Sequence, residues 1–180
     1  GVFCGYLNKP EQTKETLIDG WLHTGDVGEI DNYGNLKITD RKKDIIITAG
    51  GKNISPSEIE NELKFSPFIS DAVVIGDKRK FLSCLIMIDE ENVMKHAQDN
   101  DIPFSNFESL CKSEEIVVLI DDEVNKVNKK FAPVEQVKKF SLIDIQLTAE
   151  DDELTPTMKL KRKFINQKYG DIIESMYQSA

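Results

Sequence analysis

Two charged side chains near glycines could recognise a sugar or a phosphate group. Asp26 follows Thr24 and Gly25, and its carboxylate presents two acceptor oxygens at a spacing that suits the vicinal hydroxyls of a ribose. Arg41 lies in the charged segment of residues 40–44, and its planar guanidinium suits ribose or phosphate oxygens. Taken alone, a turn aspartate and a solvated run of charges explain these residues better, because short motifs often occur by chance.

A second basic segment has Lys159 at its centre, in the sequence LTPTMKLKRK of residues 154–163. A lysine ammonium on a long, flexible stem can stabilise negative charge that develops in a transition state. The alternatives are the solvated start of a helix, or a patch for an anionic surface formed with Lys161, Arg162 and Lys163. Neither alternative explains the preceding Leu-Thr-Pro-Thr sequence.

Paired glycines provide a third candidate segment. Gly50 and Gly51 precede Lys52 and Asn53, between an apolar run and the start of a helix. Glycines without side chains allow the close passage of another backbone or of an extended ligand. A tight strand-to-helix turn that needs a positive φ explains the glycines as well, and the two interpretations are compatible.

The segments around these residues carry clear signals of secondary structure. Residues 21–39 alternate around a turn-rich centre, which predicts a β-hairpin, and residues 45–47 suit a short buried strand. Ser55, Pro56 and Glu58 form the start signal of a helix, with a capping box between the serine and the glutamate.

Downstream, strands and helices alternate irregularly. Residues 72–75 and 81–88 are predicted strands, and the second is apolar at nearly every position, which indicates the centre of a sheet. Further predictions are helices at 90–98, 114–131 and 161–177 and a strand at 137–143. The pattern favours an α+β fold with a small mixed or antiparallel sheet flanked by helices, preceded by the hairpin.

Composition limits the possible functions. The 180 residues carry a formal net charge of −9, which argues against general nucleic-acid binding. Three scattered cysteines and two isolated histidines indicate reduced thiols and predict no metal site. No apolar run approaches the roughly 20 residues that span a bilayer. We therefore expect a cytoplasmic protein.

The sequence GWLHTGDVGEIDNYGNLKITDRKKDIIITAGGKNISPSEIE of residues 20–60, together with LTPTMKLKRK, resembles the adenylate-forming enzymes. Its wording is most similar to long-chain fatty acid CoA ligases. The resemblance implies that residues 1–42 end a large N-terminal AMP-binding domain, absent here, and that residues 43–180 form the small C-terminal lid domain. The common Ser-Gly before the family's lysine is Thr-Met here.

The resemblance also implies roles for individual residues. Lys159 would be catalytic, stabilising the charge that builds when a fatty acid attacks the α-phosphorus of ATP. Asp26 and Arg41 would bind the nucleotide, and Lys43 would be the hinge about which the lid turns. In the second step, the segment Gly50, Gly51 and Lys52 would line the tunnel for the pantetheine arm of CoA.

The expected ligands are therefore ATP or AMP, Mg²⁺ held mainly by phosphates and the absent domain, fatty acid and CoA. The expected partners are the missing N-terminal domain and, for the full-length enzyme, the surface of a membrane. The fragment alone is predicted to be inactive. Two alternatives stay open at this point: an acyl-adenylate ligase with an acceptor other than CoA, and a non-catalytic regulatory or interaction module.

Overall fold

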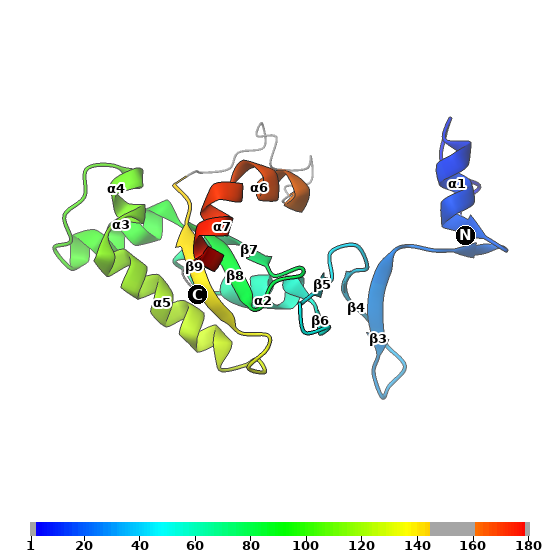
Figure 1. Ribbon diagram of the computed structural model, residues 1–180, viewed down its shortest axis with the longest axis horizontal. Helices are drawn as coiled ribbons and strands as arrows, with labels where there is room; N and C mark the ends of the chain where they lie inside the picture. Colours follow the sequence, from blue (N-terminus) through cyan, green and yellow to red (C-terminus); the bar gives the residue numbers. More distant parts are fainter. Residues whose placement is uncertain (1–2, 145–160, 179–180) are drawn as a thin grey trace. The chain divides into compact units, whose positions relative to one another are not determined.

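The computed structural model describes residues 3–144 and 161–178. The chain divides into two compact units, Gly1–Ile45 and Ile46–Ala180 (Figure 1). Lys159 and the LTPTM sequence before it lie outside the described residues. Each unit is described by itself below.

The first unit consists of a short helix and two antiparallel hairpins. Its elements are α1 (Pro10–Thr16), β1 (Leu17–Ile18), β2 (Trp21–Leu22), β3 (Asp26–Ile30) and β4 (Leu36–Arg41). In the turn between β3 and β4, the Asp31 carboxylate accepts hydrogen bonds from the backbone amides of Tyr33 (2.8 Å) and Asn35 (2.9 Å). The predicted hairpin is thus confirmed, and an aspartate that bonds to the following backbone sets its turn.

The second unit contains a short hairpin, a three-stranded sheet and six helices among the residues described. Its elements are β5 (Ile46–Ile47), β6 (Asn53–Ile54), α2 (Pro56–Leu63), β7 (Ile69–Ile75), β8 (Leu82–Ile88), α3 (Glu90–Asp99), α4 (Phe107–Cys111), α5 (Glu114–Asn128), β9 (Val137–Leu142), α6 (Arg162–Lys168) and α7 (Gly170–Gln178).

Strand β8 is the centre of the sheet, as its nearly continuous apolar sequence predicts. It pairs with β7 in the antiparallel and with β9 in the parallel direction, and all seven of its residues are buried. The sheet is therefore mixed, and the predicted α+β fold class is confirmed. A strand that is covered on both faces has apolar residues at nearly every position, whereas a half-exposed strand alternates apolar and polar residues.

Helices cover both faces of this sheet and create two apolar cores (Figure 1). On one face, Val74, Cys84 and Ile86 pack with residues of α2, α3, α4 and α5. On the other face, Val73 and Leu85 pack with residues of α6 and α7. Successive side chains of a strand point to opposite faces, so β7 and β8 contribute to both cores.

The structure differs from the sequence-based predictions at the terminal helix, at a helix cap and at a glycine turn, among other places. The predicted terminal helix is two helices, since α6 ends at Lys168 and α7 begins at Gly170, a residue type that lowers helix stability. Ser55 is the N-cap of the described helix α2, but its side chain makes no capping hydrogen bond there. Gly50 and Gly51 lie in the turn of the β5–β6 hairpin, one strand earlier than a strand-to-helix turn.

Candidate functional site

Asp26 and Arg41 lie directly opposite each other on β3 and β4. The Arg41 Nε atom is 3.0 Å from the Asp26 Oδ1 atom, and the two side chains are 28% (Asp26) and 67% (Arg41) exposed. The Asp26 amide donates to the Thr24 hydroxyl at 3.1 Å, which orders the turn before the strand. An exposed ion pair contributes little to stability, so this carboxylate and guanidinium remain available to a ligand with hydroxyl and phosphate groups.

Gly25 closes the same end of the hairpin. Its carbonyl accepts a 2.8 Å hydrogen bond from the Lys42 amide, and its φ of +76° lies in the left-handed region. A Cβ atom built at Gly25 would meet no other atom within 4 Å. The glycine therefore serves the backbone conformation, and the space beside it is open to solvent or ligand.

The segment after β4 is a turn. The Arg41 carbonyl accepts hydrogen bonds from the amides of Asp44 (2.9 Å) and Ile45 (3.2 Å), so the chain reverses across Lys42 and Lys43. Asp40 is only 7% exposed, and its carboxylate accepts a 2.7 Å hydrogen bond from the Arg41 amide. A turn of this kind has few contacts to lose if its dihedral angles change.

The segment of Gly50, Gly51 and Lys52 is exposed at the tip of the β5–β6 hairpin. Its turn is closed through Thr48, whose amide donates to the Lys52 carbonyl (3.0 Å) and whose carbonyl accepts from the Gly51 amide (2.8 Å). Gly51 has a φ of +74°, as the turn interpretation requires. The tip thus presents backbone without Cβ atoms, which an extended ligand can approach closely.

A largely buried ion pair fixes Arg162, three residues after Lys159. The Arg162 Nη2 atom lies 2.7 Å from both carboxylate oxygens of Glu60 on α2, and Nη1 donates to the Val74 carbonyl at 2.9 Å. The Val74 amide donates to Glu60 at 2.7 Å. Burial raises the pKa of Glu60, while the Arg162 charge opposes that rise. The start of α6 is therefore tied to α2 and β7.

The sequence suggested Arg162 only as part of an alternative basic patch, and it did not single out Glu60. The signal that could have found Glu60 is its position between the buried Ile59 and Leu63 on α2. Residues three apart on a helix share a face, so a glutamate three positions before Leu63 must find a buried partner.

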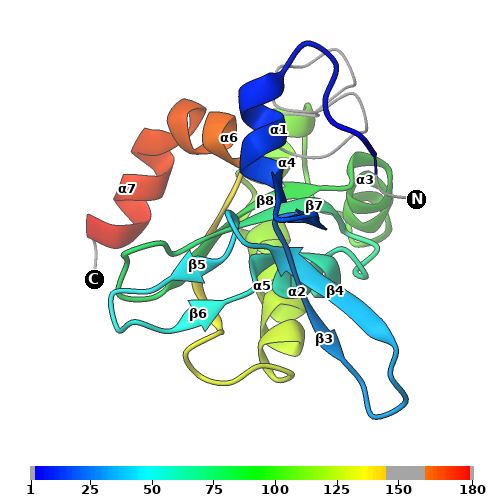
Figure 2. The same ribbon diagram turned by 90° about the vertical axis from the view of Figure 1, so that its right-hand side faces the viewer.

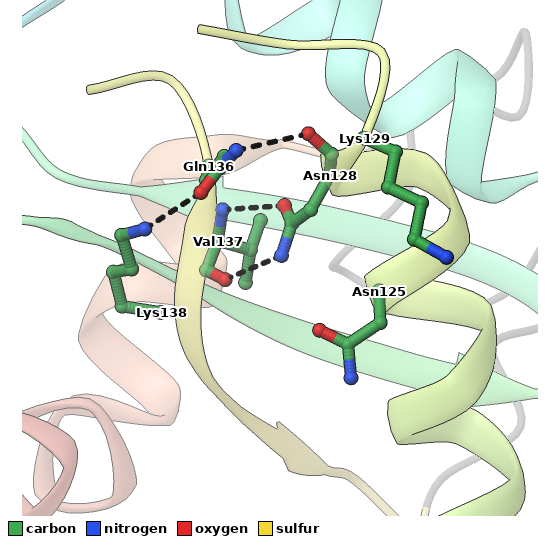
Figure 3. Close-up of a pocket in the computed structure, with 6 residues that line it drawn as sticks. All are labelled: Asn125, Asn128, Lys129, Gln136, Val137 and Lys138. Carbon is green, nitrogen blue, oxygen red and sulfur yellow. Dashed lines mark hydrogen bonds between the residues drawn. The ribbon is translucent and has the colours of Figure 1, made fainter. Parts of the chain in front are cut away.

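A pocket elsewhere contains none of the predicted site residues. It has a volume of about 420 Å³ and is lined by Asn125, Asn128, Lys129, Gln136, Val137 and Lys138 (Figure 3). The Asn128 side chain is bonded to both the amide and the carbonyl of Val137, at 2.9 Å each. These polar groups join α5 to β9, so their first role is structural.

Within residues 3–144 and 161–178, no three His, Cys, Asp or Glu side chains come together in a way that could hold a metal ion. Every helix in the same residues is too short or too polar to cross a membrane.

Comparison with known proteins gives consistent results. Residues 43–180 match the family described as AMP-binding enzyme C-terminal domain. The chain is 40% identical over 177 residues to the long-chain-fatty-acid–CoA ligase FadD15 of Mycobacterium tuberculosis, a match that covers 98% of this chain and 30% of the relative. It is 37% identical over 196 residues to the human long-chain-fatty-acid–CoA ligase ACSBG1, with coverages of 98% and 27%.

Solved structures agree on the fold. The adenylation domain of a carboxylate reductase from Mycobacterium chelonae superposes with a TM-score of 0.80 at 26% identity, covering 98% of this chain and 26% of that chain. This chain therefore spans about 30% of the length of the relatives it matches. With the family match covering residues 43–180, the chain belongs to the family of AMP-binding enzyme C-terminal domains.

Proposed function

We propose that this chain is the C-terminal part of a long-chain fatty acid CoA ligase. Such an enzyme first joins a fatty acid to AMP, with release of pyrophosphate, and then transfers the acyl group to the thiol of CoA. The observation that carries the proposal is the 40% identity, over 98% of this chain, to a relative named for this activity.

In the proposed first step, the Asp26 carboxylate accepts the two ribose hydroxyls of the nucleotide, and Arg41 beside it donates to ribose or phosphate oxygens. The 3.0 Å contact between them supports a shared ligand, since one hydroxyl-bearing group can reach both side chains. Lys159 brings a positive charge to the carboxylate and α-phosphate as negative charge builds there. Magnesium bound to ATP would supply further charge neutralisation, held by the phosphates and by the rest of the enzyme.

In the proposed second step, the lid turns about Lys43 and withdraws Lys159. The exposed tip of Gly50, Gly51 and Lys52 then lines the path of the pantetheine arm of CoA. The turn conformation around Lys43, with the boundary of the two compact units just after Ile45, supports a hinge there. Hinges are short segments whose dihedral angles absorb the motion of the packed elements on either side.

Residues 1–42 are proposed to complete a larger N-terminal domain. The β3–β4 hairpin exposes several large apolar side chains, with 73% of Ile30, 92% of Tyr33 and 66% of Leu36 accessible. Apolar surface concentrated in one small element is typical of a face that packs on another part of a protein.

The proposed enzyme is cytoplasmic, with peripheral membrane contact that vesicle sedimentation of the full-length protein would test.

The decisive experiment separates the two half-reactions of the full-length enzyme. Lys159→Ala should slow acyl-AMP formation by about 10²–10³-fold, the effect of losing one transition-state charge contact, while thioester formation from supplied acyl-AMP and CoA is retained. Lys161→Ala is the matched control, because it removes a neighbouring positive charge and should leave acyl-AMP formation nearly unchanged. If both variants lose acyl-AMP formation equally, the segment acts as a general basic patch and Lys159 has no specific catalytic role.

The same experiment tests a non-catalytic module, which predicts unchanged adenylation in Lys159→Ala. The 180-residue chain alone should form no acyl-CoA, and robust activity of this fragment would contradict the proposed division of the enzyme.

The second candidate function is adenylation with an acceptor other than CoA. The similar adenylation domain of a carboxylate reductase is 26% identical, whereas the relatives that are 37–40% identical are named CoA ligases, so the CoA ligase is the first candidate. An assay of the full-length enzyme with ATP, fatty acid and CoA decides between the two, because only the CoA ligase produces a thioester.

A further inference from the structure

The β5–β6 hairpin that carries Gly50, Gly51 and Lys52 is bonded to the turn between β7 and β8 (Figure 2). The Lys78 amide donates to the Ile47 carbonyl at 2.8 Å, and the Ala49 amide donates to the Arg79 carbonyl at 2.9 Å. The Ile47 amide donates to the Asp77 carboxylate at 3.2 Å. Residues 47–49, which lead into the tip of the hairpin, are therefore held by hydrogen bonds to residues 77–79.

The hairpin depends on this support because its own ladder is short. β5 and β6 pair through only two residue pairs, Ile46 with Ile54 and Ile47 with Asn53. An isolated two-stranded hairpin is marginally stable at best in water, and a hairpin with only two residue pairs is expected to be less stable than a longer one. Its buried isoleucines locate the base of the hairpin, whereas the bonds to residues 77–79 orient the part next to the tip.

The supporting turn is itself anchored to the last helix. The Arg79 guanidinium forms an ion pair with Glu174 of α7 and lies 4.7 Å from the centre of the Tyr177 ring. The Tyr177 hydroxyl is within hydrogen-bonding distance of the Ser83 hydroxyl (2.9 Å) and the Ile75 carbonyl (3.1 Å). A continuous set of contacts thus runs from α7 through the β7–β8 turn to the glycine tip.

We propose that Asp77 and Arg79 are positioning residues for the CoA half-reaction, because they set the orientation of the Gly50–Lys52 tip. This inference rests on the proposed role of that tip in CoA binding. Asp77 acts through its carboxylate, and Arg79 acts through its carbonyl, which its own side chain holds in place against α7. Small displacements of a substrate-positioning element are enough to slow a reaction strongly.

Asp77 is suited to a sharp test because its contact is exposed. Loss of one exposed hydrogen bond leaves the two apolar cores intact, so the variant is expected to fold. In the full-length enzyme, Asp77→Ala should lower kcat/KM for CoA by about tenfold, measured with supplied acyl-AMP, and leave acyl-AMP formation unchanged. Asp77→Asn keeps an oxygen that accepts the Ile47 amide and should restore the CoA step.

Two more variants complete the design. Lys80→Ala alters an exposed side chain of the same turn outside these hydrogen bonds, and it should behave as the wild type. Arg79→Ala should reproduce the selective loss in the CoA step, because it frees the turn from Glu174 and Tyr177. A loss of both half-reactions in equal measure for Asp77→Ala would show a general structural role and overturn the inference.

The failure of this inference can be told apart from the failure of the proposed function. Gly51→Ala strains the tip directly, since its φ of +74° disfavours a side chain. If Gly51→Ala leaves the CoA step unchanged, the tip has no role in CoA binding. If Gly51→Ala slows that step while Asp77→Ala does not, the tip functions but Asp77 does not position it.

Discussion

Removal of the Arg162 guanidinium is expected to destabilise the second unit more than any surface ion pair would. Arg162→Met takes away two contacts to the Glu60 carboxylate at 2.7 Å and one to the Val74 carbonyl at 2.9 Å. Of these contacts, Glu60 then keeps only the hydrogen bond from the Val74 amide. Its side chain is only 11% exposed, so water can replace only part of what is lost. Leaving one member of a buried ion pair without its partner costs about 3–5 kcal/mol.

The expected cost lies near the lower end of that range. The Arg162 side chain is 24% exposed, so water can reach part of the site and solvate the remaining carboxylate. A loss of about 3 kcal/mol lowers the melting temperature by roughly 6–12 °C for a chain of this size. Glu60→Met with Arg162→Met removes both charges and should recover only part of the loss, because the Val74 amide and carbonyl then lose their side-chain partners.

The assay is urea denaturation of the 180-residue chain followed by far-ultraviolet circular dichroism. Fluorescence of Trp21, the single tryptophan, would report on the first unit, where its side chain is 76% exposed. The control is Lys130→Met, which breaks a more exposed pair with Glu62 and should cost at most about 1 kcal/mol. An Arg162→Met variant as stable as this control would refute the reasoning.

The same ion pair predicts a dependence on pH. Because burial raises the pKa of Glu60 above 4.5, the folded chain binds this proton more tightly than the unfolded chain does. The contribution of Glu60 is then fully present below about pH 4.5 and declines as the pH rises through the folded pKa. Relative to Glu60→Gln, the wild type should lose stability from pH 4 to 7. A gain in stability over this pH range would mean that the Arg162 charge lowers the Glu60 pKa by more than burial raises it.

Further predictions concern the three thiols and Gly76, which packs against Leu82. Burial raises the pKa of Cys111 to about 11 and that of Cys84 well above its usual value, whereas Cys4 is exposed, so a thiol reagent at pH 8 should modify Cys4 first and the buried pair only on unfolding. In Gly76→Ala, the new Cβ would lie 2.3 Å from the Leu82 Cδ2 atom, which should cost about 1–3 kcal/mol in the same denaturation assay. Leu82→Ala added to Gly76→Ala should relieve that clash without refilling the core.

Strand β8 shows what the sequence predicts well. Leu82 to Ile88 is almost uniformly apolar, and such a run fits only a position covered on both sides. The break in the C-terminal helices shows the opposite case. Apolar residues at helical spacing continue across it, with Ile165, Tyr169 and Ile173 all buried, so the periodicity hides the end of α6 before Tyr169. Tertiary packing decides such breaks.

The sequence singled out Asp26 and Arg41 as candidates, but it did not predict that the two side chains face each other. Pairing runs regularly from Ile30 with Leu36 to Gly28 with Ile38, and then a bulge shifts the register. Because of that bulge, Asp26 faces Arg41. Regular pairing would have placed Asp40 opposite Asp26, with two carboxylates side by side. The sequence contains no clear signal of this bulge, since its strands are short and largely exposed and many registers bury a similar surface.

The start of α6 and the β5–β6 hairpin are joined to β7 and to the turn that follows it by different contacts. Glu60 and Arg162 join the start of α6 to Val74, while the turn that begins at Gly76 holds the β5–β6 hairpin. Changes in separate contacts are expected to add independently, whereas a change in β7 itself would act on both. If Lys159 and the glycine tip serve successive half-reactions, as proposed, changes in the contacts of Arg162 and changes in the contacts of residues 77–79 should affect stability and the CoA step separately.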